Sequence, residues 1–375
     1  MINLYDYIII GGGIAGSSIA YFLKHKQPGL KILIIDKNTD IAAGASGAAG
    51  AFLSPLLGKP NKFKTLVNNS LNFSTEFYKN NFSKFIIQKG VLRIPKDSID
   101  EQKFESYKPF MDFKYTKENY FNQKGYFFDV GALVDSVKIC KGLVNDIDFM
   151  SNVLVDSILF KHDSWYINNK IQSQNIILAT GANIDIMNKI LQETYINIRP
   201  VWGQRVIATT TSKIKFNIHK AHSISLTKHL KADLNLVSIG ATHKRGILED
   251  DINDDDTNYL INYAVKEFGL ENLTFIQAKA GARAGSYDYL PIIGSLIDSK
   301  ATILAYPYLK KGSKVPTDKF IKYKNLYIFN GVGGRGFVLS PYLADILSDY
   351  ILYNKKIPQN LTSDRLFIKY VRKLS

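Results

Sequence analysis

The sequence predicts an α/β fold in which an antiparallel-sheet domain interrupts a nucleotide-binding domain. Three observations indicate this fold. A strand, a glycine-rich turn, a helix and a second strand follow one another within residues 5–36, and a second strand–glycine–helix segment spans residues 326–353. Between them, residues 199–245 alternate apolar and polar side chains and are rich in β-branched residues, as in antiparallel sheets. At roughly 150 residues per domain, 375 residues accommodate two domains.

The composition is that of a globular protein, because 46% of the residues are hydrophobic and 22% are charged, which excludes a disordered chain. The chain has no run of about 18 apolar residues, so no transmembrane helix is expected. The apolar run Tyr7–Ile10 is too short for an export signal, and we expect a cytoplasmic protein. The single cysteine, Cys140, excludes an internal disulfide and a cysteine-cluster metal site, and we expect it in the core.

The net charge is strongly positive. Lysine and arginine total 48 against 33 aspartate and glutamate residues, which gives +15. A balance of this sign favours a polyanionic partner or an anionic substrate. The alternative is compositional drift, since the chain is also rich in Asn, Ile and Tyr. The charge bears on association and not on the fold.

The N-terminal segment predicts a βαβ unit. The apolar run Tyr5–Ile10 is bounded by glycine and indicates a buried strand. Residues Ser17–His25 have helical spacing of their apolar side chains, and Lys31–Ile35 indicates a second strand. This strand ends at Asp36, so a carboxylate is expected at the edge of the sheet next to the glycine-rich turn.

The turn carries the dinucleotide-binding motif G-x-G-x-x-G. Gly11 allows the tight turn, Gly13 lets the backbone approach a pyrophosphate, and Gly16 permits close packing of helix on strand. The free N–H groups at the start of the helix bind phosphates. Asp36 follows Gly11 by 25 positions and is a candidate to bind a ribose hydroxyl, with Lys37 beside it. The alternative is a glycine-rich turn without a ligand, but it does not account for an acidic residue, Asp36, at the end of the second strand.

Hydrophobic periodicity predicts the remaining elements, except that residues 97–125 stay unassigned. The predicted helices are Leu66–Phe82, Val130–Gly142, Asp254–Phe268 and Ser340–Tyr353. The predicted strands are Val91–Pro95, Leu154–Phe160, Trp165–Ile167, Asn175–Ala179 and Leu326–Asn330.

Two further glycine-containing turns favour FAD over NAD as the dinucleotide. Thr180 and Gly181 follow a predicted strand, and Gly331–Gly336 lies between a strand and a helix. A nicotinamide-binding domain needs neither turn. An extended FAD that spans the sheet can use a second helix N-terminus near its isoalloxazine ring.

With these motifs the sequence resembles the D-amino-acid-oxidase and glycine-oxidase superfamily. The resemblance rests on Gly11–Gly16, Gly44–Gly47, Ala179–Gly181, Gly281–Arg283, Leu290–Gly294 and Gly331–Gly336. More narrowly, the chain is similar to the C-terminal oxidase domain of the MnmC family, bifunctional enzymes that modify the tRNA wobble uridine. The narrower features are Pro55–Leu57, Gly240–Gly246, Asp288–Pro291, Gly334–Gly336, Ser340–Pro341 and Arg365.

The resemblance implies a glutathione-reductase-like, Rossmann-type FAD-binding domain interleaved with an antiparallel-sheet substrate domain. We expect the FAD-binding domain at residues 1–60, 126–198 and 281–375, and the substrate domain at 61–125 and 199–280. In the MnmC family a methyltransferase domain precedes this one. Here the nucleotide motif begins at residue 11, so we expect no such domain in this chain and expect any methylation to need a separate methyltransferase.

The activity implied by the resemblance is FAD-dependent oxidation of the carboxymethylaminomethyl group of wobble uridine, which releases glyoxylate and leaves 5-aminomethyluridine. One alternative is a small-molecule amine oxidase or dehydrogenase that acts on glycine, sarcosine or D-amino acids with the same fold. Another is a flavin- or RNA-binding protein that has lost catalysis. The presence of Arg283 and all the glycine-rich loops argues against the last alternative.

Three residues are candidates for the catalytic site. The guanidinium of Arg283 is expected to bind both oxygens of the substrate carboxylate, and the alternative is a surface ion pair. Arg335 is expected to face flavin or substrate, or else to be a cation of the loop. Gln204 lies on a segment that resembles a strand near the substrate, and a structural role is equally open. No metal ligand is predicted.

The resemblance also assigns flavin contacts. Gly333, Gly334 and Gly336 are expected to bring backbone N–H groups to the pyrimidine side of the flavin ring, next to Arg335. Ala45 and Ser46 are expected to line the path of the phosphates and ribityl chain. Val153 is expected to meet the adenine through its backbone.

Binding of tRNA at the anticodon loop implies basic clusters with aromatic residues between them, since phosphate contacts give salt-dependent affinity and rings stack on an extruded base. The alternative for each cluster is a solvated basic face. The candidate cations are Lys310, Lys311, Lys314, Lys319, Lys322, Lys324, Arg365, Lys369, Arg372 and Lys373. The interleaved aromatics are Tyr306, Tyr308, Phe320, Tyr323, Phe367 and Tyr370.

Overall fold

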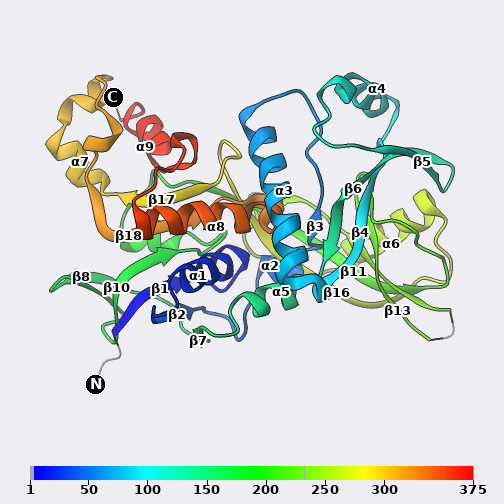
Figure 1. Cartoon of the computed structure of the whole chain (residues 1–375), viewed down its shortest axis with the longest axis horizontal. Helices are drawn as coiled ribbons and strands as arrows, with labels where there is room; N and C mark the ends of the chain where they lie inside the picture. Colours follow the sequence, from blue (N-terminus) through cyan, green and yellow to red (C-terminus); the bar gives the residue numbers. More distant parts are fainter. Residues whose placement is uncertain (1–3, 232, 375) are drawn as a thin grey trace.

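A computed structural model describes residues 4–231 and 233–374 (Figure 1). Ala232, within the segment predicted as antiparallel sheet, lies outside the described residues. So do residues 1–3 and 375 of the predicted FAD-binding domain. The described strands form one sheet of eight strands and another of ten. Among the described residues, no helix combines the length and the apolar composition needed to cross a membrane.

The first sheet contains the N-terminal βαβ unit. Its strands are β1 (Leu4–Ile10), β2 (Ile32–Ile35), β7 (Asp148–Met150), β8 (Ile158–Lys161), β9 (Ser164–Ile167), β10 (Ile171–Leu178), β17 (Ile292–Ile297) and β18 (Lys322–Asn330). They lie in the order β17–β18–β10–β1–β2–β7, with β9 also paired to β10 and β8 paired to β9. The five strands from β18 to β7 are parallel, whereas β17 is antiparallel to β18.

Helices cover both faces of this sheet, as a parallel sheet requires. One face packs on α1 (Ile14–Lys26), α3 (Lys62–Phe82), α5 (Ser136–Leu143) and α8 (Gly336–Tyr353). The other face packs on α9 (Asp364–Val371), next to α7 (Ser299–Ala305). Ile9 enters the first core and Ile8 the second, because successive side chains of a strand point to opposite faces. Cys140 is buried on α5.

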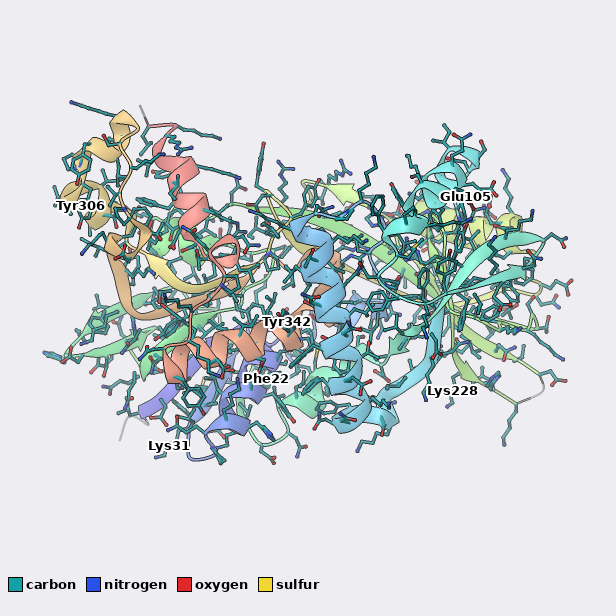
Figure 2. All side chains as sticks on the ribbon, turned by 45° about the horizontal axis from the view of Figure 1, so that its top comes forward. Phe22, Lys31, Glu105, Lys228, Tyr306 and Tyr342 are labelled. Carbon is teal, nitrogen blue, oxygen red and sulfur yellow. The ribbon has the colours of Figure 1, made fainter. Side chains whose placement is uncertain are left out.

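Aromatic rings join α1, α3 and α8, which lie together at the centre of the molecule (Figure 1). Phe22 of α1 and Tyr342 of α8 lie close to α3 (Figure 2). The ring of Phe73 on α3 lies 6.1 Å from that of Phe22 and 5.6 Å from that of Tyr342, centroid to centroid. Two side chains of α3 also bond to the backbone of α8. Ser74 Oγ donates to the carbonyl of Val338, and the hydroxyl of Tyr78 donates to that of Phe337.

The second sheet is almost entirely antiparallel, as residues 199–245 predicted. Among the strands that the structure describes in it, only β4 and β12 are parallel to each other. One face packs on α6 (Asp254–Phe268), whose bounds are those predicted, through Leu260 and Phe268. The helices α2 (Ala45–Ala48) and α4 (Ser98–Tyr107) flank the sheet. The strands are β3 (Phe52–Leu53), β4 (Ile86–Arg93), β5 (Thr116–Tyr120), β6 (Gln123–Val134), β11 (Ile198–Thr210), β12 (Ile218–His219), β13 (Ser223–His229), β14 (Asn235–Gly240), β15 (Lys244–Arg245) and β16 (Thr274–Ser286).

The helix predicted at Val130–Gly142 is wrong in its first half. The run up to Val134 belongs to β6, which pairs with β4, and only α5 is helical. Its N-cap is Asp135, whose carboxylate accepts from the N–H of Lys138 at 3.1 Å. Periodicity alone does not separate a buried strand from a buried helix in a short apolar run. The run up to Val134 is a strand because it pairs with β4, a strand some 40 residues away in the sequence.

The predicted domain boundaries do not coincide with the ends of strands in the two sheets. Residue 126, a predicted boundary, lies inside β6, which pairs with β4 and β5 in the second sheet. Residue 281, another boundary, lies inside β16, which continues along β11 to Ser286. The helix α3 falls in the range predicted for the substrate domain, but it packs on α8 beside the first sheet.

The contact between α3 and α8 can be tested through Tyr78, which is fully buried and whose hydroxyl lies 3.0 Å from the carbonyl oxygen of Phe337. We expect Tyr78→Phe to lower the free energy of unfolding by about 1 kcal/mol, because the buried carbonyl loses a donor. Urea denaturation measures the change. Tyr308→Phe, at a ring that is 46% exposed, is the control. Equal stability of the two variants would contradict the prediction.

Candidate functional site

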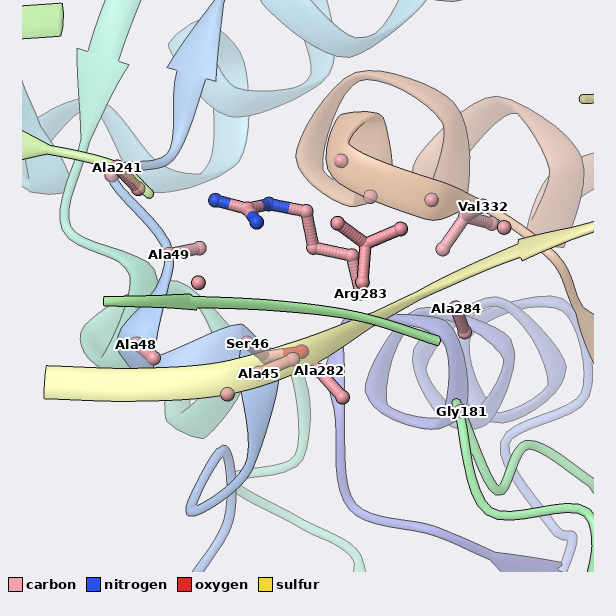
Figure 3. Close-up of a pocket in the computed structure, with 18 of the residues that line it drawn as sticks. Ala45, Ser46, Ala48, Ala49, Gly181, Ala241, Ala282, Arg283, Ala284 and Val332 are labelled. Atoms are coloured by element: carbon pink, nitrogen blue, oxygen red, sulfur yellow. The ribbon is translucent and has the colours of Figure 1, made fainter. Parts of the chain in front are cut away.

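A cavity of about 710 Å³ runs from the start of α1 to β11 and β16 of the second sheet. Glycine-rich loops before α1 and α8 line one end, with α2 beside them. Strands of the second sheet line the other end, where Arg283 reaches across the cavity (Figure 3). The size is within the range of about 300–1,000 Å³ that is usual for small-molecule and cofactor sites.

The turn before α1 has the geometry that the dinucleotide motif requires. Gly11 has a φ of 115°, and a Cβ there would lie 2.3 Å from the carbonyl oxygen of Ala179. A Cβ on Gly16 would lie 1.9 Å from the carbonyl oxygen of Gly11, so the helix packs directly on the turn. Gly13 is the N-cap of α1 and lines the cavity. Gly13 has no side chain to cap the helix, so apart from the N–H of Ile14, which donates to Ser46 Oγ, the N–H groups of the first turn are left for a phosphate.

Asp36, the candidate to bind a ribose hydroxyl, lies beside this turn. Its Oδ2 accepts from the backbone N–H of Gly12 at 2.6 Å, and its Oδ1 accepts from Asn38. The backbone N–H of Val153, the predicted adenine neighbour, donates to the carbonyl of Asp36 at 3.0 Å. Neither Asp36 nor Val153 is among the residues that line the cavity. The ammonium of Lys37 instead pairs with Glu249 at 3.3 Å on the surface.

The middle of the cavity is walled by small residues. Ser46 Oγ accepts from the N–H of Ile14 at 2.9 Å, which ties α2 to the start of α1. A Cβ on Gly281 would lie 2.8 Å from Cα of Ala45, so β16 passes close to α2. Gly181 lines the cavity, and the hydroxyl of Thr180 is buried without a hydrogen-bond partner. These features fit an extended dinucleotide between α1 and β16.

Arg283 occupies the far end of the cavity. Its side chain extends from β16 toward Ala49 and Ala241 (Figure 3). Nη1 donates to the carbonyl of Thr242 at 3.2 Å, and a Cβ on Gly203 would lie 2.2 Å from the same nitrogen. Burial lowers the pKa of this guanidinium. The absence of a side chain at Gly203 therefore makes the space in which the guanidinium lies.

The described lining of the cavity contains seven basic residues and no Asp or Glu. The basic residues are Arg199, Arg205, Arg245, Arg283, His219, His222 and His243. Arg205 is held by Ser238 Oγ at 3.0 Å and the carbonyl of Gly47 at 3.4 Å. Without a carboxylate to balance them, these groups favour an anionic ligand.

The histidines of the lining are held in the neutral form. Burial, followed by the charge of Arg283, lowers the pKa of His243 to about 4. Burial and the charge of Arg93 hold the pKa of His219 well below its usual range. Burial also lowers the pKa of His222, whose Nε2 lies 2.9 Å from the hydroxyl of Tyr259. At neutral pH the positive charge of the cavity therefore comes from its arginines.

Arg335 does not line the cavity, although Gly333, Gly334 and Gly336 around it do. Its Nη1 donates to the carbonyl of Ser54 at 2.9 Å, and burial lowers its pKa to about 10. Of the two predicted environments, the structure favours a cation that secures a loop.

Gln204 does not line the cavity, so of the two roles left open for it the structure favours the structural one. The side chain is fully buried and donates to Thr257 Oγ1 at 2.7 Å and to the carbonyl of Asn253 at 3.0 Å. Its oxygen accepts from the N–H of Asn253. Gln204 thus joins β11 to the N-terminus of α6. The residue that sequence reasoning missed is its neighbour Gly203, whose only signal was a glycine inside a strand pattern.

Several residues predicted to contact RNA are engaged in the fold. Arg365 forms a two-bonded ion pair with Asp288, at 2.9 and 3.1 Å. Phe320 and Phe367 are buried against each other, with ring centroids 5.1 Å apart, so they cannot stack on a base. Lys310, Lys311 and Lys314 are exposed at the end of the molecule that carries α7 and α9 (Figure 1).

The space at Gly203 provides a test of Arg283 that keeps its charge. We expect Gly203→Ala to displace the guanidinium and to weaken binding of a carboxylate ligand such as glycolate by about tenfold or more. Binding is measured by titration of the purified protein. Gly29→Ala, where a Cβ would meet nothing within 4 Å, is the control. Equal affinity in both variants would contradict the assigned position of Arg283.

His219 gives the protein an acid-sensitive stability. Its folded-state pKa is below the ordinary value of 6.5, so the unfolded state binds more protons as the pH falls below that value, and stability decreases. We expect the melting temperature of His219→Gln to fall less between pH 7 and 5 than that of the wild type. His162→Gln, on an exposed turn, is the control. A parallel decline of all three proteins would refute this role.

The chain is similar to curated proteins named tRNA 5-methylaminomethyl-2-thiouridine biosynthesis bifunctional protein MnmC. It is 24% identical over 373 residues to that of Legionella pneumophila (strain Philadelphia 1), covering 93% of this chain and 54% of the relative. It is 24% identical over 367 residues to that of Campylobacter fetus, covering 92% and 56%. The chain thus spans about half the length of these relatives.

Solved structures share the fold. Glycine oxidase from Geobacillus kaustophilus has a TM-score of 0.73 at 15% identity, covering 94% of this chain and 96% of that one. L-proline dehydrogenase from P. horikoshii has a TM-score of 0.75 at 16% identity, covering 97% and 98%. These likenesses confirm the predicted fold class. The family model described as FAD dependent oxidoreductase matches residues 6–350, and the chain therefore belongs to the DAO family of FAD-dependent oxidoreductases.

Proposed function

We propose that this protein uses FAD to oxidise the carboxymethylaminomethyl group of wobble uridine in tRNA, releasing glyoxylate and leaving 5-aminomethyluridine. The charge of the cavity carries the proposal, because its described lining holds four arginines and no acid. A substrate carboxylate and the phosphates of an RNA strand both suit that charge. A free amino acid shares the amine and the carboxylate but brings no phosphates to that charge.

The relatives support the same assignment. Their name states a role in the biosynthesis of a modified uridine in tRNA and describes them as bifunctional. This chain matches about half of each. We propose that it performs the oxidising activity of this modification.

FAD, when bound, supplies the two-electron oxidant for hydride removal from the carbon between the amine and the carboxylate. Arg283 binds the carboxylate through two parallel hydrogen bonds and so fixes that carbon in place. Its side chain is already confined, since Gly203 and Gly334 leave room for it and for little else. Binding therefore costs little additional ordering of this arginine.

The substrate amine must be neutral when the hydride leaves. The lining of the cavity includes Ala48, Ala49 and Ala241, whose methyl groups offer water no hydrogen-bond partner. Burial and the surrounding guanidinium charges both disfavour an ammonium and lower its pKa. The oxidation yields an imine, and its hydrolysis releases glyoxylate and leaves the primary amine on the uridine.

A second candidate is a small-molecule amine oxidase or dehydrogenase. The likeness to glycine oxidase and L-proline dehydrogenase favours it, since the same fold is found in proteins named for those substrates. The fold by itself does not decide between the two candidates.

Anaerobic mixing separates the two candidates. The flavoprotein is mixed with tRNA carrying 5-carboxymethylaminomethyluridine and, in parallel, with glycine, sarcosine and D-alanine. We expect flavin bleaching with the tRNA, followed by 5-aminomethyluridine in nucleoside mass spectrometry. Affinity for the tRNA should decrease with salt, because phosphate contacts release counterions. Bleaching with a free amino acid alone would assign the protein to the second candidate.

Arg283→Met should lower kcat/KM for the modified tRNA by roughly 100-fold, because a charge-assisted hydrogen-bonded pair is lost in a buried site. Arg283→Lys keeps the charge without the planar fork and should recover only part of the loss. Stopped-flow flavin reduction measures both variants. Wild-type rates in Arg283→Met would refute the role of this arginine in binding the carboxylate.

A further inference from the structure

Two tyrosines are exposed on the turn that follows β16, at the rim of the cavity. Tyr287 is 57% exposed and Tyr289 is 65% exposed, and Tyr289 lines the cavity. Both lie within six residues of Arg283 on the same segment. Large aromatic side chains with this exposure beside a binding cavity indicate a surface that meets a ligand or partner.

The turn is held rigidly in a conformation that presents these rings. Between them, Asp288 forms the ion pair with Arg365. Ser286 Oγ donates to the carbonyl of Leu290 at 2.6 Å, which closes the turn. Tyr289 has a φ of 65°, a left-handed conformation that is unfavourable for a bulky residue and that glycine would adopt freely. The backbone at Tyr289 is therefore strained, and the fold keeps a tyrosine there in spite of that strain.

An arginine completes the rim. The guanidinium carbon of Arg199 lies 3.5 Å from the ring centroid of Tyr287, in a stacked cation–π contact. Arg199 comes from β11, where it pairs with Gly285 of β16, and Arg245 of β15 lies beside the same stretch of β11. Both arginines line the cavity, whose described lining has no Asp or Glu.

We propose that Tyr287, Tyr289 and Arg199 form a stacking platform for an unstacked nucleobase of the RNA substrate, at or next to the reacting uridine. Aromatic rings and guanidinium planes are the surfaces on which proteins stack single-stranded bases, and arginines beside them contact the phosphates. The platform holds the base at the rim while its side chain reaches Arg283. This inference rests on the proposed function and names the residues that select a nucleotide over a free amine.

Steady-state oxidation of tRNA carrying 5-carboxymethylaminomethyluridine tests the platform. We expect Tyr289→Ala to raise KM for the tRNA by about tenfold or more, since base stacking on one ring contributes about that much. The kcat at saturating tRNA should change much less, because Arg283 and the flavin site are intact. Tyr289→Phe keeps the ring and should restore the KM. Arg199→Lys keeps the charge but not the plane and should behave like Tyr289→Ala.

A binding measurement supplies a readout besides activity. An anticodon stem-loop with 2-aminopurine next to the wobble position should be quenched on binding to the wild-type flavoprotein, and less so on binding to Tyr289→Ala. Tyr353→Ala, at a ring 53% exposed at the end of α8, is the matched control for both assays. Melting temperatures establish that the variants are folded.

The outcomes separate the platform from the proposed function. Wild-type KM and quenching in Tyr289→Ala, with active oxidation of tRNA, would overturn the platform and leave the function standing. A Tyr289→Phe variant as impaired as Tyr289→Ala would also overturn stacking, because the hydroxyl would then be the contact. A wild-type protein that neither binds nor oxidises the RNA would overturn the function and the platform with it.

Discussion

The pairing of β16 with β11 is the interaction on which the site depends. The two strands run antiparallel from Ile198 opposite Ser286 to Thr209 opposite Thr274. The register of this pairing brings Gly281 close to α2. It also places the guanidinium of Arg283 over Gly203. The wall of the cofactor cavity, the carboxylate-binding arginine and the aromatic rim are therefore parts of one ladder. A slip of one residue would turn each of these side chains to the opposite face of the sheet.

Buried arginines held by uncharged groups lie in the cavity lining (Arg205 and Arg283) and outside it (Arg93 and Arg335), and give this region its electrostatic character. Arg93, Arg283 and Arg335 donate to backbone carbonyls, and Arg205 donates to a hydroxyl and a carbonyl. Burial lowers the pKa of each of these guanidinium groups. Hydrogen bonds to carbonyls satisfy the donors without neutralising the charge, so desolvation remains partly uncompensated until an anion binds. A site that stores positive charge in this way gives up some stability for selectivity toward an anionic substrate.

Two polar residues that the sequence marks as functional act instead through their neighbours. Gln204 fixes the start of α6 to β11 and so supports the strand that carries Gly203. Arg365, on the C-terminal helix α9, binds Asp288 and so fixes the turn that presents the two tyrosines. Gln204 and Arg365 are both positioning residues. Each belongs to a motif near the site but acts by holding a neighbouring segment in place. The C-terminal helix thereby contributes to the rim of a cavity formed largely by other parts of the chain.

The sequence by itself determined the dinucleotide end of the cavity and the α/β class. The strand, the turn and α1 lie within about 20 residues, and steric contacts at Gly11 and Gly16 act over that short range. The capped, amphipathic α6 was predicted to the residue for the same local reason. Only the tertiary structure decided that the run before Val134 is a strand, that Arg283 enters the cavity whereas Arg335 does not, and that the rim is aromatic. Each of these depends on the register of strands far apart in the chain, and local propensity and motif spacing hold no information about that register.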